Sequence, residues 1–346
     1  MSRYVDWAFA AASARRLAPS GPKVEMAEAH EIIEEIRALA AAAHEPVATT
    51  AQMVTPPDAP PPLVVDRGLW IDTNARSMSA MLDPVVEKAA GGGMAPSSVA
   101  RLVGGKLTAL EAGGLLAFMS AKVLGQYDIA PGGTPTLMLV APNMVQVAQE
   151  LDLVPRDFRF WVCLHEETHR VQFTAVPWLR EHVITTVQTL MSEMVPEPGD
   201  LPDRLQQAAR EIPRLFGGES NGLMEIFATP EQRAQIADLT AVMSLLEGHA
   251  DVVMDDVGPE HVPTVSTIRQ RFEARRKSLG SADKVLRRLL GLDAKMRQYR
   301  DGAAFVRGVQ EAVGVEGFNA VWTSPHTLPR AEEITDPQAW VTRVHG

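Results

Sequence analysis

The sequence predicts a mainly α-helical protein with a small β-sheet. Apolar residues recur at helical spacing through most of the 346 residues, whereas only two short segments, 63–65 and 136–140, have the composition of strands. With 46% hydrophobic and 22% charged residues, the chain can bury a sizeable core. A disordered chain is therefore not expected.

The helical segments fall on both sides of a Pro-rich stretch at residues 55–62, which predicts an extended linker. We expect helices near residues 4–17, 26–44, 67–90, 97–126, 144–151, 156–173, 178–194 and 200–216, one around Glu247, and several after it. We therefore expect an N-terminal helical region with its linker (1–62), a core (63–260), and a C-terminal helical region packed on that core (261–346).

The most informative motif is the pentapeptide His165-Glu166-Glu167-Thr168-His169. Two histidines four positions apart lie on one helical face, so both imidazoles can reach a single metal ion. Glu166 lies about 100° around the helix from His165, where its carboxylate can act on a metal-bound water without being a ligand. The preceding segment 155–164 has a helical apolar face with Pro155 in its first turn. The motif therefore predicts a catalytic zinc site on a mostly buried helix.

A catalytic zinc site needs a third protein ligand and an open position for water. Glu247 and Asp251 lie four positions apart in an apolar helix, where two carboxylates would otherwise repel each other. We expect Glu247 to be the ligand and Asp251 to accept a hydrogen bond from a ligand histidine. His249 is the competing third ligand, but it lies about 200° around the helix from Glu247. It can instead be a hydrogen-bonded core histidine or a proton donor to the oxyanion.

Five segments of the sequence resemble a family of zinc-dependent metalloproteases that is common in actinobacteria and grouped with the zincins. They are Leu124 to Asp128, Val140 to Asn143, His165 to Arg180, Glu247 to Asp251 and Met296 to Gly302. Members are also labelled as associated with the biosynthesis of a deazaflavin redox coenzyme.

The resemblance implies that the 63–260 core is a zincin-like catalytic core with one Zn²⁺ per chain. His165, His169 and Glu247 would be the ligands, and Glu166 the general base. The Glu-x-x-x-Asp spacing of Glu247 and Asp251 is similar to that of the gluzincin branch, in which the Asp orients a ligand histidine.

Catalysis would also need a second stabiliser for the oxyanion, for which Tyr299, Tyr127 and His249 are candidates. The segment 136–140 can form a sheet edge that pairs with an extended peptide, or it can be a buried strand. The function that fits best is a zinc-dependent hydrolase, a metallopeptidase that cleaves amide bonds with a zinc-activated water. The alternatives are a zinc hydrolase acting on a non-peptide small molecule and a zincin-like binding or scaffolding protein with an occluded site.

The net charge of −10 and pI near 5.4 argue against nucleic acid or an anionic membrane as a partner. The predicted hydrolase chemistry leads us to expect a peptide or small amide substrate. The basic stretch between Arg269 and Arg288 has the interleaved apolar residues of amphipathic helices. The single cysteine, Cys163, excludes an internal disulfide and suits core packing. The N-terminal segment has Asp6 within its apolar stretch, unlike a secretory signal, which favours a cytoplasmic protein.

Overall fold

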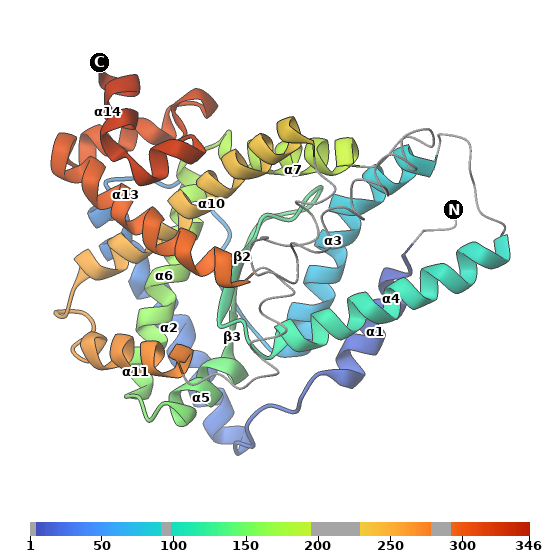
Figure 1. Ribbon diagram of the computed structural model, residues 1–346. Coiled ribbons are helices and arrows are strands. Elements are labelled where there is room, and N and C mark those ends of the chain that lie inside the picture. The colour runs from blue at the N-terminus through green and yellow to red at the C-terminus, as the bar shows by residue number, and fades with distance from the viewer. Residues whose placement is uncertain (1–4, 91–97, 195–228, 278–291) are drawn as a thin grey trace. The chain divides into compact units, whose positions relative to one another are not determined.

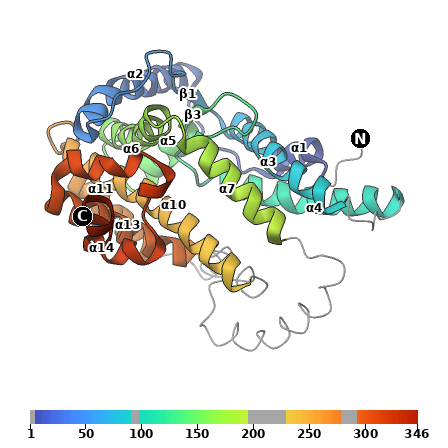
Figure 2. The same cartoon turned by 90° about the horizontal axis from the view of Figure 1, so that it is seen from above.

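The computed structural model describes residues 5–90, 98–194, 229–277 and 292–346 (Figures 1 and 2). Residue contacts divide the chain into two units. The first contains Met1–Pro177 and Val253–Phe272, and the second contains Trp178–Val252 and Glu273–Gly346. The three-part division by sequence segment stays a prediction.

A three-stranded sheet lies at the centre of the first unit. Its strands are β1 (Leu63–Val65), β2 (Gly125–Asp128) and β3 (Thr136–Val140), in the order β1-β3-β2. β1 runs parallel to β3, and β2 runs antiparallel to it. The expectation that 136–140 forms a sheet edge is therefore wrong, because β3 is the central strand. The alternative of a buried strand is confirmed, since four of its five residues are buried.

One face of the sheet is covered by α1 (Trp7–Leu17), α3 (Arg67–Ala90) and α4 (Ser98–Ser120) (Figure 1). Side chains from these helices and from the strands form a continuous apolar cluster, as hydrophobic faces at helical and strand periodicity require. Its buried members are Ala11, Ala14, Val65, Trp70, Ile71, Ala75, Leu116, Ala117, Met138 and Val140. Asp6 begins α1 by accepting a hydrogen bond from the backbone N–H of Phe9.

The other face of the sheet carries α6 (Pro155–Ala175), which packs on β2, β3, α5 (Ala141–Glu150) and α2 (Met26–Ala51) (Figure 2). Helix α2 runs seven residues beyond the expected end at residue 44, through Pro46. Proline removes a backbone donor and disfavours the helix interior. The helix continues because Val47 and Ala51 extend its buried face beyond Pro46, and tertiary packing outweighs the local preference.

The second unit is helical in its described residues. It contains α7 (Leu179–Met194), most of α10 (Pro230–Val257), α13 (Leu292–Phe318), three 3-10 turns (Asn319–Trp322, Pro325–Thr327 and Ala331–Thr335) and α14 (Pro337–His345). Trp340 of α14 is fully buried and meets Phe305 of α13 edge to face, with 6.0 Å between ring centroids. Arg343 adds a two-pronged ion pair with buried Glu333, at 2.6 and 2.8 Å.

The mainly α architecture with a small sheet confirms the fold class expected from the sequence. The sequence predicted a single helix near residues 97–126. In the structure, helix α4 ends at Ser120, and residues from Gly125 form strand β2. The helix expected at 200–216 lies outside the described residues, as does the second half of the basic stretch. Among the helices described, none has the length and apolar character needed to cross a membrane.

A buried amide joins α5 to the segment between α4 and β2, and its loss is expected to be costly. Asn143 Nδ2 donates to the carbonyls of Ser120 and Val123 at 2.7 and 2.6 Å, and its Oδ1 accepts from Arg67 Nε at 2.7 Å. Asn143→Ala should lower the free energy of unfolding by about 3 kcal/mol, because these buried groups lose their partner. Urea unfolding measures the change. The exposed Gln149→Ala on the same helix is the control, and an equal effect of both variants would contradict the prediction.

Candidate metal site

Helix α6 places both motif histidines on one face. Pro155 lies in its first turn, where the missing N–H costs no helical hydrogen bond, and the helix continues without interruption to Ala175. The rings of His165 and His169 lie edge to face with centroids 4.9 Å apart. Both side chains are partly exposed, whereas Val162, Cys163 and most of the surrounding helix are buried. A pair of neighbouring imidazoles is thus held at the accessible side of a buried helix.

Glu166 lies against the backbone of β2. Its side chain is 8% exposed, and it occupies the space beside Gly125. A Cβ atom on Gly125 would lie 2.5 Å from Glu166 Cγ and 2.7 Å from Cδ, closer than atoms can approach. The absence of a side chain at residue 125 therefore makes room for the carboxylate next to the strand.

The second motif histidine has a hydrogen-bond partner on its own helix. His169 Nδ1 lies 3.0 Å from Gln172 Oε1, and Gln172 has no exposed surface. Residues three apart on a helix lie on the same face, which allows this contact. Gln172 was not among the residues expected from the sequence, although its spacing from His169 could have indicated it.

Glu167 projects from another side of α6 and joins it to α2. Glu167 is 1% exposed and receives two hydrogen bonds from Arg170, at 2.8 Å from Nε and 2.6 Å from Nη2. His44 Nδ1 of α2 lies 2.7 Å from Glu167 Oε1, and Thr55 Oγ1 lies 3.2 Å from His44 Nε2. The carboxylate is thus compensated by a buried guanidinium and an imidazole, as burial of a charge requires. No role was expected for Glu167 from the sequence.

Glu247 lies on α10, where that helix passes very close to α13. A Cβ atom on Gly248 would lie 2.2 Å from the Gly302 carbonyl carbon, and one on Gly302 would lie 2.0 Å from the Ser244 oxygen. Only glycine permits two helix backbones to approach this closely. The close approach of α10 and α13 sets the position of Glu247 within the second unit. It also explains why glycine occurs in two of the segments that resemble the metalloprotease family, Glu247 to Asp251 and Met296 to Gly302.

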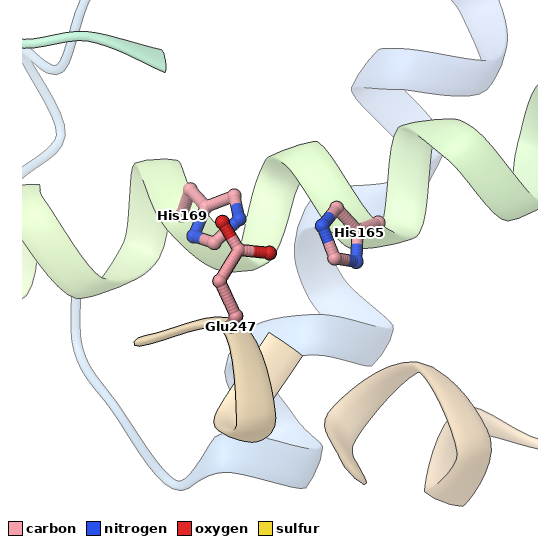
Figure 3. A group of neighbouring side chains, drawn as sticks. All are labelled: His165, His169 and Glu247. Atoms are coloured by element: carbon pink, nitrogen blue, oxygen red, sulfur yellow. The ribbon is translucent and has the colours of Figure 1, made fainter. Parts of the chain in front are cut away.

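The side chains of His165, His169 and Glu247 come together, with the carboxylate pointing toward the two imidazoles (Figure 3). One potential ligand atom from each lies within 4.8 Å of the others. Ligands of tetrahedral zinc, with bonds of about 2.1 Å, are about 3.4 Å apart, so small side-chain rotations would suffice. Two imidazoles and one carboxylate suit zinc and leave one position for water. The donor set therefore fits a catalytic zinc ion.

The sequence also predicted four further site residues, whose places in the structure are as follows. His249 is fully buried and stacks on Phe318, with centroids 5.3 Å apart. Tyr127 of β2 stacks on Phe173 of α6, at 5.3 Å and an interplanar angle of 9°. Tyr299 lies on α13, where its side chain is outside the described part of the chain. Asp251 lies one turn after Glu247 on α10 and is partly buried.

Cys163 has the packing role expected from the sequence. Its thiol is 1% exposed, and burial, with smaller contributions from the charges of Glu166 and Glu167, raises its pKa far above the ordinary value. A buried thiol that resists ionisation is neither a metal ligand nor a nucleophile.

Comparison with known proteins supports these observations. A family model described as zincin-like metallopeptidase matches residues 5–341. The chain is also similar to the crystal structure of "a putative hydrolase with a novel fold" from Chloroflexus aurantiacus, with 30% identity, 99% of each chain covered and a TM-score of 0.69. No curated protein matches the sequence. The match over nearly the whole chain confirms the resemblance that the sequence motifs indicated.

The Glu167 network leads to a stability prediction. Glu167→Gln removes the charge that compensates buried Arg170, so it should lower the free energy of unfolding by about 3 kcal/mol. Chemical denaturation measures this change. The exposed Glu45→Gln on α2 is the control and should have almost no effect. A Glu167→Gln variant as stable as the wild type would show that the ion pair contributes nothing net.

Proposed function

This chain belongs to the zincin-like metallopeptidase family, and we propose that it is a zinc-dependent peptidase that cleaves amide bonds by hydrolysis. The observation that carries the proposal is the convergence of His165, His169 and Glu247 within 4.8 Å. The carboxylate of Glu166, which follows His165 on α6, is buried against a strand. Ligands and a general base are the groups that this chemistry requires.

In this proposal His165, His169 and Glu247 hold the metal. Bound zinc would supply Lewis acidity, which makes water nucleophilic near neutral pH and polarises a carbonyl. Glu166 takes the proton from the attacking water and returns it to the leaving amine, which a carboxylate can do when it is held within hydrogen-bond reach of both. Its contact with the Gly125 backbone restricts the carboxylate to few orientations.

A peptide substrate is supported by the position of β2. In the part of the chain that the structure describes, β2 is an outer strand of the sheet and pairs with the central strand β3. An extended peptide can pair with the edge of such a strand without preference for side chains. Because Gly125 of β2 touches Glu166, a chain paired there would run next to the proposed base.

Metal analysis separates the ligands from the base. Purified wild type and Glu166→Ala should each retain one zinc per chain, whereas Glu247→Ala should bind zinc weakly because it loses a direct ligand. The exposed Glu231→Ala on α10 is the control for Glu247→Ala. Hydrolysis of a degenerate peptide library by Glu166→Ala should be about 10²- to 10⁴-fold slower than by wild type. Undiminished zinc in Glu247→Ala would place the third ligand elsewhere, and absence of zinc from the wild type would refute the proposal.

The space beside Gly125 provides a test of the base itself. Gly125→Ala should push the Glu166 carboxylate away from its position, and a displacement of about 1 Å reduces kcat by roughly 10²-fold. Zinc content should not change, because neither ligand histidine is displaced. Gly133→Ala in the β2–β3 loop is the control, since its Cβ would meet only an ordinary 3.5 Å contact. Full activity of Gly125→Ala would contradict the role given to Glu166.

A further inference from the structure

We propose that Gln172 is a positioning residue that fixes the tautomer of His169 and thereby presents the Nε2 atom of that imidazole to the metal ion. The inference rests on the proposed function, because it concerns a ligand of the same site. It extends that function by assigning which ring nitrogen binds and what holds the ring in place.

The hydrogen-bond geometry determines the tautomer. Gln172 Oε1 can only accept a hydrogen bond, so the His169 Nδ1 atom at 3.0 Å must carry the proton. A neutral imidazole has one N–H, and the proton on Nδ1 leaves the lone pair on Nε2. Metal-ligating histidines commonly donate their other N–H to such an acceptor, which orients the ring.

The burial of Gln172 makes the contact a fixed one. The side chain has no exposed surface and lies in the last turns of a continuous helix, so its amide has few alternative rotamers. Its Oε1 atom is therefore held where only one orientation of the His169 ring can meet it. Without this acceptor, the ring could exchange protons between its nitrogens and rotate.

From the sequence we expected a carboxylate, that of Asp251, to accept the hydrogen bond of a ligand histidine. The residue in contact with His169 is instead an amide, Gln172, and the negative charge on α6 accounts for this choice. Helix α6 already buries the carboxylates of Glu166 (8% exposed) and Glu167 (1% exposed) within six residues of Gln172. A third carboxylate in the same low-dielectric region would be repelled by both. A neutral amide supplies the acceptor without this repulsion.

The test measures tautomer and metal affinity separately. In metal-free protein, ¹⁵N NMR of the neutral His169 ring should show the proton on Nδ1. Gln172→Met keeps a similar shape without the acceptor, so its ring should become a mixture of both tautomers. Its zinc Kd, measured by chelator competition, should rise about 10- to 100-fold. Gln172→Glu supplies an acceptor and should restore the Nδ1–H tautomer, while repulsion from Glu166 and Glu167 lowers the stability of the variant.

A second buried glutamine supplies the matched control. Gln232 is 6% exposed, and its Nε2 atom donates to the Glu193 carbonyl at 2.8 Å within the second unit. Gln232→Met should leave the His169 tautomer and the zinc Kd unchanged, even if it lowers stability. Equal loss of zinc affinity in Gln232→Met and Gln172→Met would overturn the inference, because the effect would then be general destabilisation.

Two further outcomes are decisive. A proton on Nε2 in the wild type, or an unchanged tautomer in Gln172→Met, would overturn the role of Gln172. If the wild type binds no zinc but its tautomer still depends on Gln172, the contact with His169 stands and the zinc hydrolase proposal fails. The metal-free measurement therefore distinguishes failure of this inference from failure of the function on which it rests.

Discussion

Helix α6 is mostly buried, so its polar side chains need hydrogen-bond or charge partners. Residues of the first unit supply these partners. A buried charge without a partner is costly enough to unfold a domain of ordinary stability. Arg170 and His44 therefore surround Glu167, and the β2 backbone lies against Glu166. Within the motif 165–169, only the two histidines remain partly exposed. Burial and compensation of Glu166 and Glu167 thus leave the imidazoles as the accessible groups of the motif.

Close approaches to the backbone at glycine residues also fix the positions of the proposed site residues. Glu166 lies where it does because Gly125 has no side chain, and α10 and α13 can meet because Gly248 and Gly302 have none. In both places a single methyl group would overlap neighbouring atoms. These glycines belong to three of the sequence segments that resemble the metalloprotease family. They contribute no chemical group, and their role is to permit an approach that positions the proposed base and the proposed third ligand.

Local pattern predicted most helices but not every boundary. The ends of α3 and α7 agree with the expected 67–90 and 178–194 within a residue, because their apolar periodicity is bounded by clear breaks. The end expected near residue 44 was wrong for α2, since local propensity does not record the packing that extends this helix through Pro46 to Ala51. Strand β2 was missed because Gly125–Asp128 has almost no strand character and is extended through its pairing with β3. The same pairing places β3 at the centre of the sheet.

The sequence alone determined the residues whose chemistry depends on local spacing. His165 and His169 lie on one face because four helical residues make about one turn, and Glu166 follows from the same geometry. The tertiary structure decided what depends on distant segments meeting. It brought Gly125 to Glu166 and His44 to Glu167, and it showed that Gln172 is buried in contact with His169. Helical periodicity acts over a few residues, whereas partners contributed by other elements are selected by packing, which no local pattern records.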